Sequence, residues 1–268
     1  MIIGNNNIIY EEGMIMDLYK KGEKHYMEKK YEKAYEIFKT VYESGEKIND
    51  TLNYMGCCEL QLGNYQKAIN LFDEVIKVNP DWERPVFNKG RAYIKLENYD
   101  EALKCLEQAL LINPESEDVY FYLGVFYYQK GDFDKAIGYY KKSLSINKNQ
   151  PDTYLNMGMI YSRLENYDMA LNEFDRALET DNNFVDALFN KGFILARLKK
   201  YTDALLVFNK AHSLDPNDLS VMEEILILYW RQRDLENTEQ WIKKILSIDI
   251  NNTKAKTIKE SLENIIKQ

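Results

Sequence analysis

Apolar and polar positions along the chain repeat with a period of 34 residues, from about residue 15 to beyond residue 200. Inside each period, apolar residues recur three and four apart over two stretches, a spacing that is typical of amphipathic α-helices. Internal repeats of this length mark stacked structural units, so the pattern predicts a tandem array of helical hairpins. The fourth position of the period carries a large side chain in six successive copies: Leu18, Leu52, Val86, Tyr120, Tyr154 and Leu188.

Two small residues mark every period at a fixed separation of 12 residues. Glycine inside a helix costs about 1 kcal/mol relative to alanine, so a repeated glycine indicates a close helix–helix crossing where a Cβ atom would clash. We expect the alanines, on the second helix, to face the same crossing. The glycines are Gly22, Gly56, Gly90, Gly124, Gly158 and Gly192, and the alanines are Ala34, Ala68, Ala102, Ala136, Ala170 and Ala204.

Turn and capping residues mark the predicted helix boundaries. Two glycines after the first helix suit a left-handed backbone at that point, and they are Gly63 and Gly131. The residues that follow the turn can cap the second helix with a side-chain oxygen: Asn64, Asn98, Asp132 and Asn166. Proline disfavours helix in the residue before it, so three prolines end the second helix of their repeats: Pro80, Pro114 and Pro216.

The chain divides into three predicted segments. Residues 1–14 are expected to be an irregular extension, because Asn5, Asn6 and Asn7 lower helix propensity. Residues 253–268 form one more amphipathic helix, which covers the otherwise exposed end of the array. Between them, residues 15–252 contain seven repeats: 15–48, 49–82, 83–116, 117–150, 151–184, 185–218 and a degenerate 219–252.

The period and the residues at fixed positions resemble the tetratricopeptide repeat (TPR) family, whose pattern contains aromatic, Leu, Gly, Tyr, Ala, Phe, Ala and Pro positions. The resemblance covers residues 15 to about 252. It implies an all-α fold: a right-handed α-solenoid, or superhelix, of tandem 34-residue helix-turn-helix repeats. It also implies that the first helices line a concave groove that binds an extended peptide or protein segment, as in a non-catalytic protein–protein interaction scaffold.

The geometry of the family assigns residues of the first helices to this groove. In repeats three to six we expect an apolar band, and the alternative is that its rings pack against the neighbouring first helix. The band consists of Phe87, Phe121, Val125, Leu155, Met159, Phe189 and Phe193.

Three asparagines at the sixth position of the repeat are expected to hold the backbone of the bound peptide, since an amide offers donors and an acceptor. They are Asn88, Asn156 and Asn190, and the row is interrupted by Tyr54 and Tyr122. Hydrogen bonding between repeats is the alternative role for these amides.

Three arginines are expected to select the charge of the peptide by holding carboxylates, and they are Arg91, Arg163 and Arg197. For Arg163 and Arg197, near helix C-termini, stabilisation by the helix dipole is the alternative. Family members that bind acidic chaperone tails use a clamp of Lys, Asn, Asn, Lys and Arg. Only Arg84 has the right charge at the corresponding positions, which argues against a chaperone-tail adaptor; the set reads Tyr19, Glu23, Tyr54, Arg84 and Asn88.

Composition narrows the function classes. A net charge of −8 disfavours general binding to nucleic acid or to anionic membranes. The sequence begins without a basic leader and contains no apolar run long enough to span a membrane. Three cysteines without CxxC spacing fit a reducing, cytoplasmic location. His25 and His212 lie far apart in the array, so we expect no metal, no cofactor and no catalysis.

Two rival functions remain open from the sequence. The first is a structural protein that self-assembles through its terminal repeats, burying Trp230, Trp241 and the terminal helix against a second copy. The second is a regulatory receptor whose groove binds a small signalling peptide.

Overall fold

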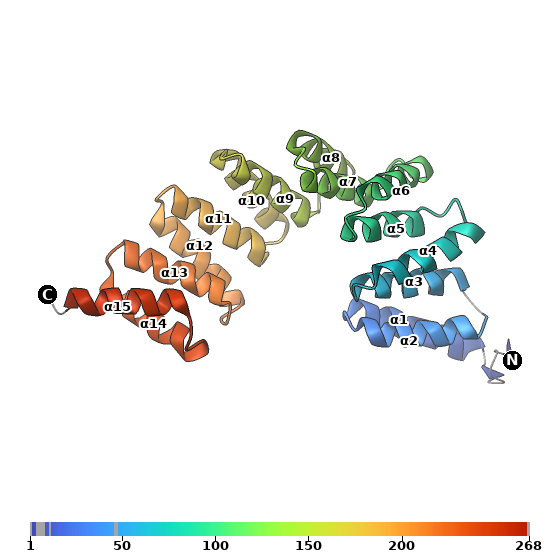
Figure 1. Cartoon of the computed structure of the whole chain (residues 1–268), viewed down its shortest axis with the longest axis horizontal. Helices are drawn as coiled ribbons and strands as arrows, with labels where there is room; N and C mark the ends of the chain where they lie inside the picture. The colour runs from blue at the N-terminus through green and yellow to red at the C-terminus, as the bar shows by residue number, and fades with distance from the viewer. Residues whose placement is uncertain (1, 4–8, 11, 46–47, 267–268) are drawn as a thin grey trace. The chain divides into compact units, whose positions relative to one another are not determined.

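The computed structural model describes residues 2–3, 9–10, 12–45 and 48–266, and this part of the chain is almost entirely helical (Figure 1). The predicted fold class, an all-α solenoid of repeated helical hairpins, is confirmed. The chain divides into two compact units, Met1–Ile146 and Asn147–Gln268, which are called unit 1 and unit 2 below.

Unit 1 contains four helical hairpins that follow one another in chain order (Figure 1). In each hairpin the odd-numbered helix is the first helix of a repeat and the even-numbered helix is the second. The helices are α1 (Glu12–Met27), α2 (Tyr31–Glu43), α3 (Ile48–Gln61), α4 (Tyr65–Val78), α5 (Glu83–Lys95), α6 (Tyr99–Ile112), α7 (Glu117–Gln129) and α8 (Phe133–Ile146).

Unit 2 contains three hairpins followed by a single helix (Figure 1). The helices are α9 (Pro151–Arg163), α10 (Tyr167–Thr180), α11 (Val185–Arg197), α12 (Tyr201–Leu214), α13 (Leu219–Arg231), α14 (Leu235–Ile248) and α15 (Thr253–Ile266). The helices before the three prolines end as the sequence predicts, at Val78, Ile112 and Leu214.

The beginning of the chain differs from the irregular extension expected for residues 1–14. Two-residue strands, β1 (Ile2–Ile3) and β2 (Ile9–Tyr10), pair antiparallel, and α1 already begins at Glu12. The three asparagines on which the expectation rested lie outside the described residues.

The repeated glycines lie at close crossings between the two helices of one hairpin, as predicted. A Cβ atom built on Gly158 would lie 2.5 Å from Cε1 of Phe174 on the second helix. The residue that meets the glycine is therefore the large side chain at position 24, whereas the sequence had directed attention to the alanine. The six alanines are fully buried in the hairpins, and the rings that occupy the glycine sites are those of Phe38, Phe72, Tyr140, Phe174 and Phe208.

Every first helix of the seven repeats ends with a residue in the left-handed region. After α5, for example, the amide of Asn98 donates to the carbonyl of Tyr93 at 2.9 Å, which closes the helix end. The two predicted glycines have φ near +80°, but five positions use a residue with a Cβ atom, which sequence preference did not indicate. The seven are Lys29, Gly63, Glu97, Gly131, Glu165, Lys199 and Arg233.

Glycine is expected to stabilise the chain at two of these positions. A left-handed backbone costs a residue with a Cβ atom about 1–2 kcal/mol, and glycine avoids this cost. Part of the gain is offset because glycine loses more conformational freedom on folding. Glu97→Gly and Glu165→Gly are each expected to raise the free energy of unfolding by about 0.5–1 kcal/mol in urea titrations. Gly131→Ala, the matched reverse change, should lower it by a similar amount. A loss of stability in both glycine variants would contradict this explanation.

The second-helix caps are only partly as predicted. The side-chain oxygens of Asp132 and Asn166 accept from the amides of Lys135 and Met169, at 3.2 and 3.4 Å. At Asn64 and Asn98 no cap hydrogen bond is present.

The last described helix, α15, packs over α13 and α14 of unit 2. Ala255 and Leu262 of α15 are buried, and they join a cluster with four core residues: Met222, Leu226, Ile242 and Ile245. Its N-terminus is fixed because the buried Asn252 accepts from the amide of Ala255 at 3.0 Å.

Glu223 on α13 connects that cap to the rest of unit 2. It accepts from Asn252 at 2.6 Å and pairs with Lys254 at 2.7 Å. Burial raises the pKa of Glu223, but the bonds from Lys254 and Asn252 outweigh burial and hold the pKa below its ordinary value. The carboxylate is therefore ionised at neutral pH and holds the start of α15 in place.

Candidate functional site

Three consecutive first helices of unit 1, α3, α5 and α7, line a hollow of about 210 Å³, called the Arg91 hollow below. First helices form one face of each hairpin, so the hollow lies on the face that the family resemblance implies for partner binding. Its lining residues are Leu60, Gln61, Arg91, Ile94, Lys95, Phe121, Tyr122, Val125 and Gln129.

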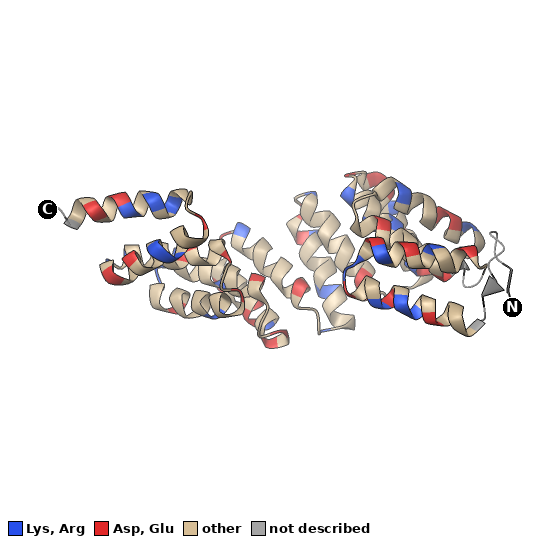
Figure 2. Ribbon diagram, turned by 90° about the horizontal axis from the view of Figure 1, so that it is seen from below, with Lys and Arg blue, Asp and Glu red and all other residues tan. Residues whose placement is uncertain are grey.

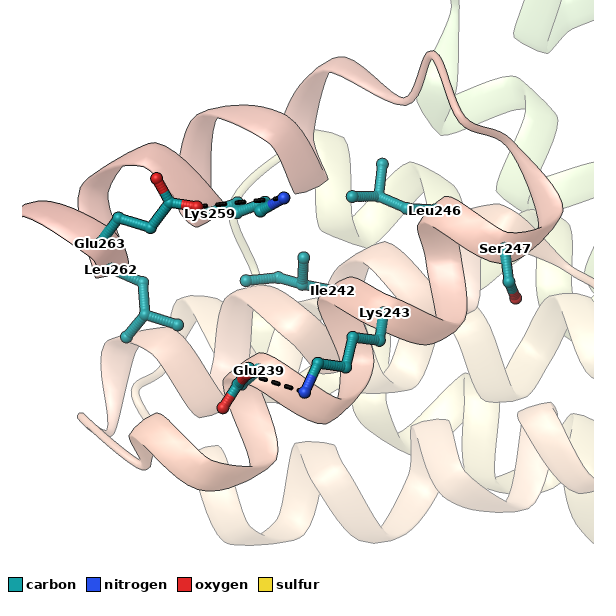
Figure 3. A pocket seen from close by; sticks show the side chains of 8 residues that line it. All are labelled: Glu239, Ile242, Lys243, Leu246, Ser247, Lys259, Leu262 and Glu263. Carbon is teal, nitrogen blue, oxygen red and sulfur yellow. Dashed lines mark ion pairs between the residues drawn. The ribbon is translucent and has the colours of Figure 1, made fainter. Parts of the chain in front are cut away.

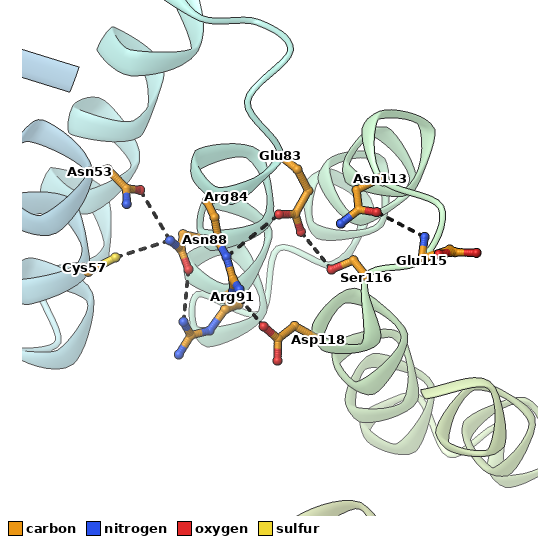
Figure 4. A network of polar contacts seen from close by, with 10 residues as sticks. All are labelled: Asn53, Cys57, Glu83, Arg84, Asn88, Arg91, Asn113, Glu115, Ser116 and Asp118. Carbon is orange, nitrogen blue, oxygen red and sulfur yellow. Dashed lines mark hydrogen bonds and ion pairs between the residues drawn. The ribbon is translucent and has the colours of Figure 1, made fainter. Parts of the chain in front are cut away.

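Arg91 is held in place by two aromatic rings and by one amide, and Figure 4 shows its bond to that amide, Asn88. Its guanidinium carbon lies 4.9 Å from the ring centre of Tyr122 and 5.6 Å from that of Phe87. Nη1 donates to Oδ1 of Asn88 at 3.0 Å, while the buried Nε finds no acceptor among the described residues. Such stacking fixes the plane of a guanidinium without neutralising its charge.

The polar groups behind Arg91 carry no negative charge at neutral pH. Asn88 donates to the Sγ atom of Cys57 at 3.3 Å and, at 3.5 Å, to Oδ1 of Asn53 (Figure 4). Burial raises the pKa of the Cys57 thiol to about 11, although Arg91 lowers it in part. No carboxylate of the described residues lies within ion-pair distance of Arg91.

Phe87 and Asn88, both expected in the groove, are packed inside unit 1 with exposed fractions of 2% and 4%. Asn88 bonds to α3 of the preceding repeat, which is the alternative role considered for the asparagine row. Through their contacts with Arg91, both residues fix the position of its guanidinium group. Phe121 and Val125 are half-buried and line the hollow directly.

Sequence analysis did not single out Tyr122, which appeared there only as an interruption of the asparagine row. Its ring packs edge-on against Phe87 with centroids 5.2 Å apart, and it provides the closer of the two faces for Arg91. The sequence did contain a signal for this contact, because Tyr122 and Arg91 were both assigned to the same face of neighbouring first helices.

A second polar group connects α5 to α7 (Figure 4). Arg84 donates to Asp118 at 2.7 Å, and the buried Glu83 accepts from Ser116 at 3.0 Å. Arg84 was the one basic residue that matched the chaperone-tail clamp, and here it pairs with a carboxylate of the next repeat.

The first helices of unit 2 present a mixed apolar and polar face. On α11, Phe193 is 41% exposed, Phe189 and Asn190 are half-buried, and Arg197 is exposed in the last turn. Nδ2 of Asn190 donates to the carbonyl of Asp186 at 2.8 Å. On α9, Leu155 is buried, Asn156 and Met159 are half-buried, and Arg163 is exposed.

A larger hollow of about 370 Å³ lies between α14 and α15 (Figure 3). Its floor is formed by Ile242, Leu246 and Leu262. Charges at its rim pair along their own helices, Lys243 with Glu239 at 2.7 Å and Lys259 with Glu263 at 3.9 Å. This hollow marks the edge of the terminal helix and is not on the first-helix face.

Trp241 belongs to the core of unit 2, which bears on the self-assembly alternative. Its ring packs edge-on against His212 at 5.0 Å and lies beneath Lys244 at 4.6 Å. Trp230 is half-buried beside Ile265. Both indoles therefore have contacts within their own unit.

Charged residues of both signs are interspersed over both units (Figure 2). Along α15 the basic positions come first, at Lys254, Lys256 and Lys259, and Glu260 and Glu263 follow. No group of three or more potential metal ligands is present among the described residues. In the same part of the chain, no helix has the length and apolar character needed to cross a membrane.

Stacked helical hairpins of this kind define the class of helical-repeat proteins. Family models described as "Tetratricopeptide repeat" match residues 87–152, 155–218 and 50–81, which is more than half of the chain. The chain belongs to the tetratricopeptide repeat family. Proteins of this family are generally non-catalytic and bind protein partners.

Solved structures of TPR proteins share the fold. YrrB, described as a TPR protein with an unusual peptide-binding site, is 22% identical with a TM-score of 0.57, over 70% of this chain and 97% of that one. Yeast Tom70 is 19% identical with a TM-score of 0.67; the match covers 96% of this chain and 55% of Tom70. A thermophilic TPR protein from Thermus thermophilus is 20% identical with a TM-score of 0.63; the match covers 68% of this chain and 99% of that one. A search of curated proteins found no match.

Proposed function

We propose that the chain is a scaffold that binds an extended, partly apolar segment of a partner protein along the first helices of its repeats, 15–252. The observation that carries this proposal is the same combination of groups in both units. Partly exposed aromatic rings lie beside amide and guanidinium groups, as at Phe121 and Arg91 in unit 1 and at Phe193 and Arg197 in unit 2.

Each kind of group has a defined role in such binding. Rings supply contact area that binding removes from water, and a Phe side chain contributes about 1.5–3 kcal/mol when fully buried. Amides such as Asn156 and Asn190 can pair with the partner's backbone, since the Oδ1 atom of Asn190 is not used by its bond to Asp186. The guanidinium groups select for acidic residues.

The proposal is tested with peptides selected from a random dodecapeptide display library against the whole chain. Phe193→Ser is expected to weaken binding of such peptides to unit 2 by roughly tenfold or more, measured by fluorescence anisotropy, because it removes an exposed ring from the binding face. Asn156→Ala combined with Asn190→Ala should weaken binding further by removing partners of the peptide backbone.

The matched control is Leu206→Ser on the second helix α12, where the leucine is 73% exposed. It removes a comparable exposed apolar group from the opposite side of the hairpin and should leave affinity unchanged. If Leu206→Ser lowers the affinity of the peptides and neither first-helix change does, the binding surface lies on the second helices and the proposal is overturned.

A further inference from the structure

We infer that the Arg91 hollow binds a carboxylate attached to an apolar group, such as the free end of a peptide chain or an acidic residue beside an apolar one. The inference rests on the proposed function, because it assigns a ligand chemistry to one place on the first-helix face. Four features of the hollow support it: a fixed cation, a second cation, the absence of an ion-paired carboxylate among the described residues, and an apolar wall.

The first feature is the fixed guanidinium. Tyr122 and Phe87 hold its plane, and Asn88 uses one hydrogen on Nη1. Nη2 has no hydrogen bond to a described residue, and the buried Nε has none either. The N–H donors left on the two terminal nitrogens can pair with the oxygens of a carboxylate, and their positive charge favours this ligand over a neutral amide.

The second feature is Lys95, one helical turn after Arg91 on α5. Both side chains line the hollow, and like charges four residues apart on a helix repel each other. Lys95 lies in the last turn, where the helix dipole favours a cation, but Arg91 lies a turn further in and gains less from it. A bound anion would relieve the repulsion between the two side chains.

The third feature is that the other basic residues of α5 form ion pairs with nearby carboxylates, whereas Arg91 and Lys95 form none with the described residues. Arg84 pairs with Asp118 at 2.7 Å, and Lys89 pairs with Asp73 at 2.6 Å. Neither Arg91 nor Lys95 has an ion pair with a described residue. In a chain of net charge −8, two neighbouring cations without such partners on a binding face point to an external anion.

The fourth feature is the apolar wall. Ile94, Phe121 and Val125 line the hollow, while the amides of Gln61 and Gln129 are exposed at its edge. The volume of about 210 Å³ suits a group of the size of one amino-acid residue. The site therefore takes an apolar side chain together with a neighbouring carboxylate. It lies at other repeat positions than the chaperone-tail clamp, whose matching residue Arg84 is already paired.

Small probes test the inference on the whole chain without a known partner. N-acetyl-leucine supplies a carboxylate and one apolar side chain, and N-acetyl-leucinamide is its neutral match. Titrations followed by NMR at the methyl groups of Ile94 and Val125 should show saturation by the acid at millimolar concentrations. The amide should need at least about tenfold more, because it cannot form the paired charge-assisted bonds to Arg91. N-acetyl-aspartyl-leucinamide distinguishes a side-chain carboxylate from a free chain end: tighter binding of one probe identifies the source.

Variants then assign the effect to residues. Arg91→Gln should raise the half-saturation concentration of N-acetyl-leucine by about tenfold, and Lys95→Gln, at an exposed side chain, by a smaller factor. Lys104→Gln on the second helix α6 removes the same charge elsewhere and should change nothing. The comparison of acid with amide on the unaltered chain stands even if Arg91→Gln does not fold.

Equal binding of acid and amide, or an unchanged titration with both Arg91→Gln and Lys95→Gln, would overturn the inference. In that case the peptide selections still decide the proposed function independently, because their readout depends on Phe193 in unit 2. Failure of both experiments would remove the first-helix face as the binding surface.

Discussion

Phe174→Ala is expected to lower the free energy of unfolding of unit 2 by about 3–5 kcal/mol, the range measured when a buried phenylalanine is truncated and its cavity stays open. The ring is fully buried and occupies the space above Gly158, where a helix backbone without a Cβ atom receives it. Denaturant titrations followed by tryptophan fluorescence in a Trp82→Phe background, which leaves only Trp230 and Trp241 of unit 2, measure the effect. Phe193→Ala on the exposed face should cost less than about 1 kcal/mol.

A double-mutant cycle tests the interlocking directly. Gly158→Ala alone places a Cβ atom against the Phe174 ring and is expected to cost about 1–3 kcal/mol by overpacking. In the Phe174→Ala background the same methyl group enters vacated space, so its cost should largely disappear. Additive effects of the two changes would show that the contact between ring and glycine is not what holds this hairpin together.

Removal of residues 253–268 is expected to destabilise unit 2 by about 3–5 kcal/mol, since fully burying one leucine contributes about 1.5–3 kcal/mol and several apolar side chains lose their cover. The exposed surface would include Leu226, Ile242 and Ile245, which α15 now covers through Ala255 and Leu262. Thermal unfolding measures the stability, and light scattering measures the expected association through this new apolar patch.

Two point variants separate the contribution of packing from that of chain length. Leu262→Ala should reproduce a large part of the loss, about 2–4 kcal/mol, whereas Lys256→Ala at an exposed position of α15 should have little effect. An unchanged melting temperature and a monodisperse shortened chain would rule out a capping role for α15.

The fold followed from the sequence because its constraints are local and recur at every period. A buried alanine and a glycine at a crossing depend on one hairpin, and six copies make the pattern clear. The residue that meets the glycine was not identified, because spacing along one helix does not tell which side chain of the other reaches it. The left-handed Glu97 and Glu165 were missed for a related reason: the turn imposes this backbone against their preference.

The candidate site was less predictable, because it depends on contacts between repeats. Phe87 was expected at the surface but is buried between first helices, and the position alone fits either outcome. Tyr122 was regarded as an interruption, although its ring supports Arg91. The free charge of Arg91 required knowledge of which carboxylates Arg84 and Lys89 had already engaged. Such pairings cross from one helix to another and leave no periodic signal.

The contact between ring and glycine joins residues 16 apart in one hairpin, as in Gly124 with Tyr140, and never joins different hairpins. Duplication or loss of a 34-residue block of coding sequence therefore leaves every such contact complete. The number of hairpins can change over evolutionary time by whole copies. Under the proposed function, the length of partner segment that the repeats accommodate changes in the same steps.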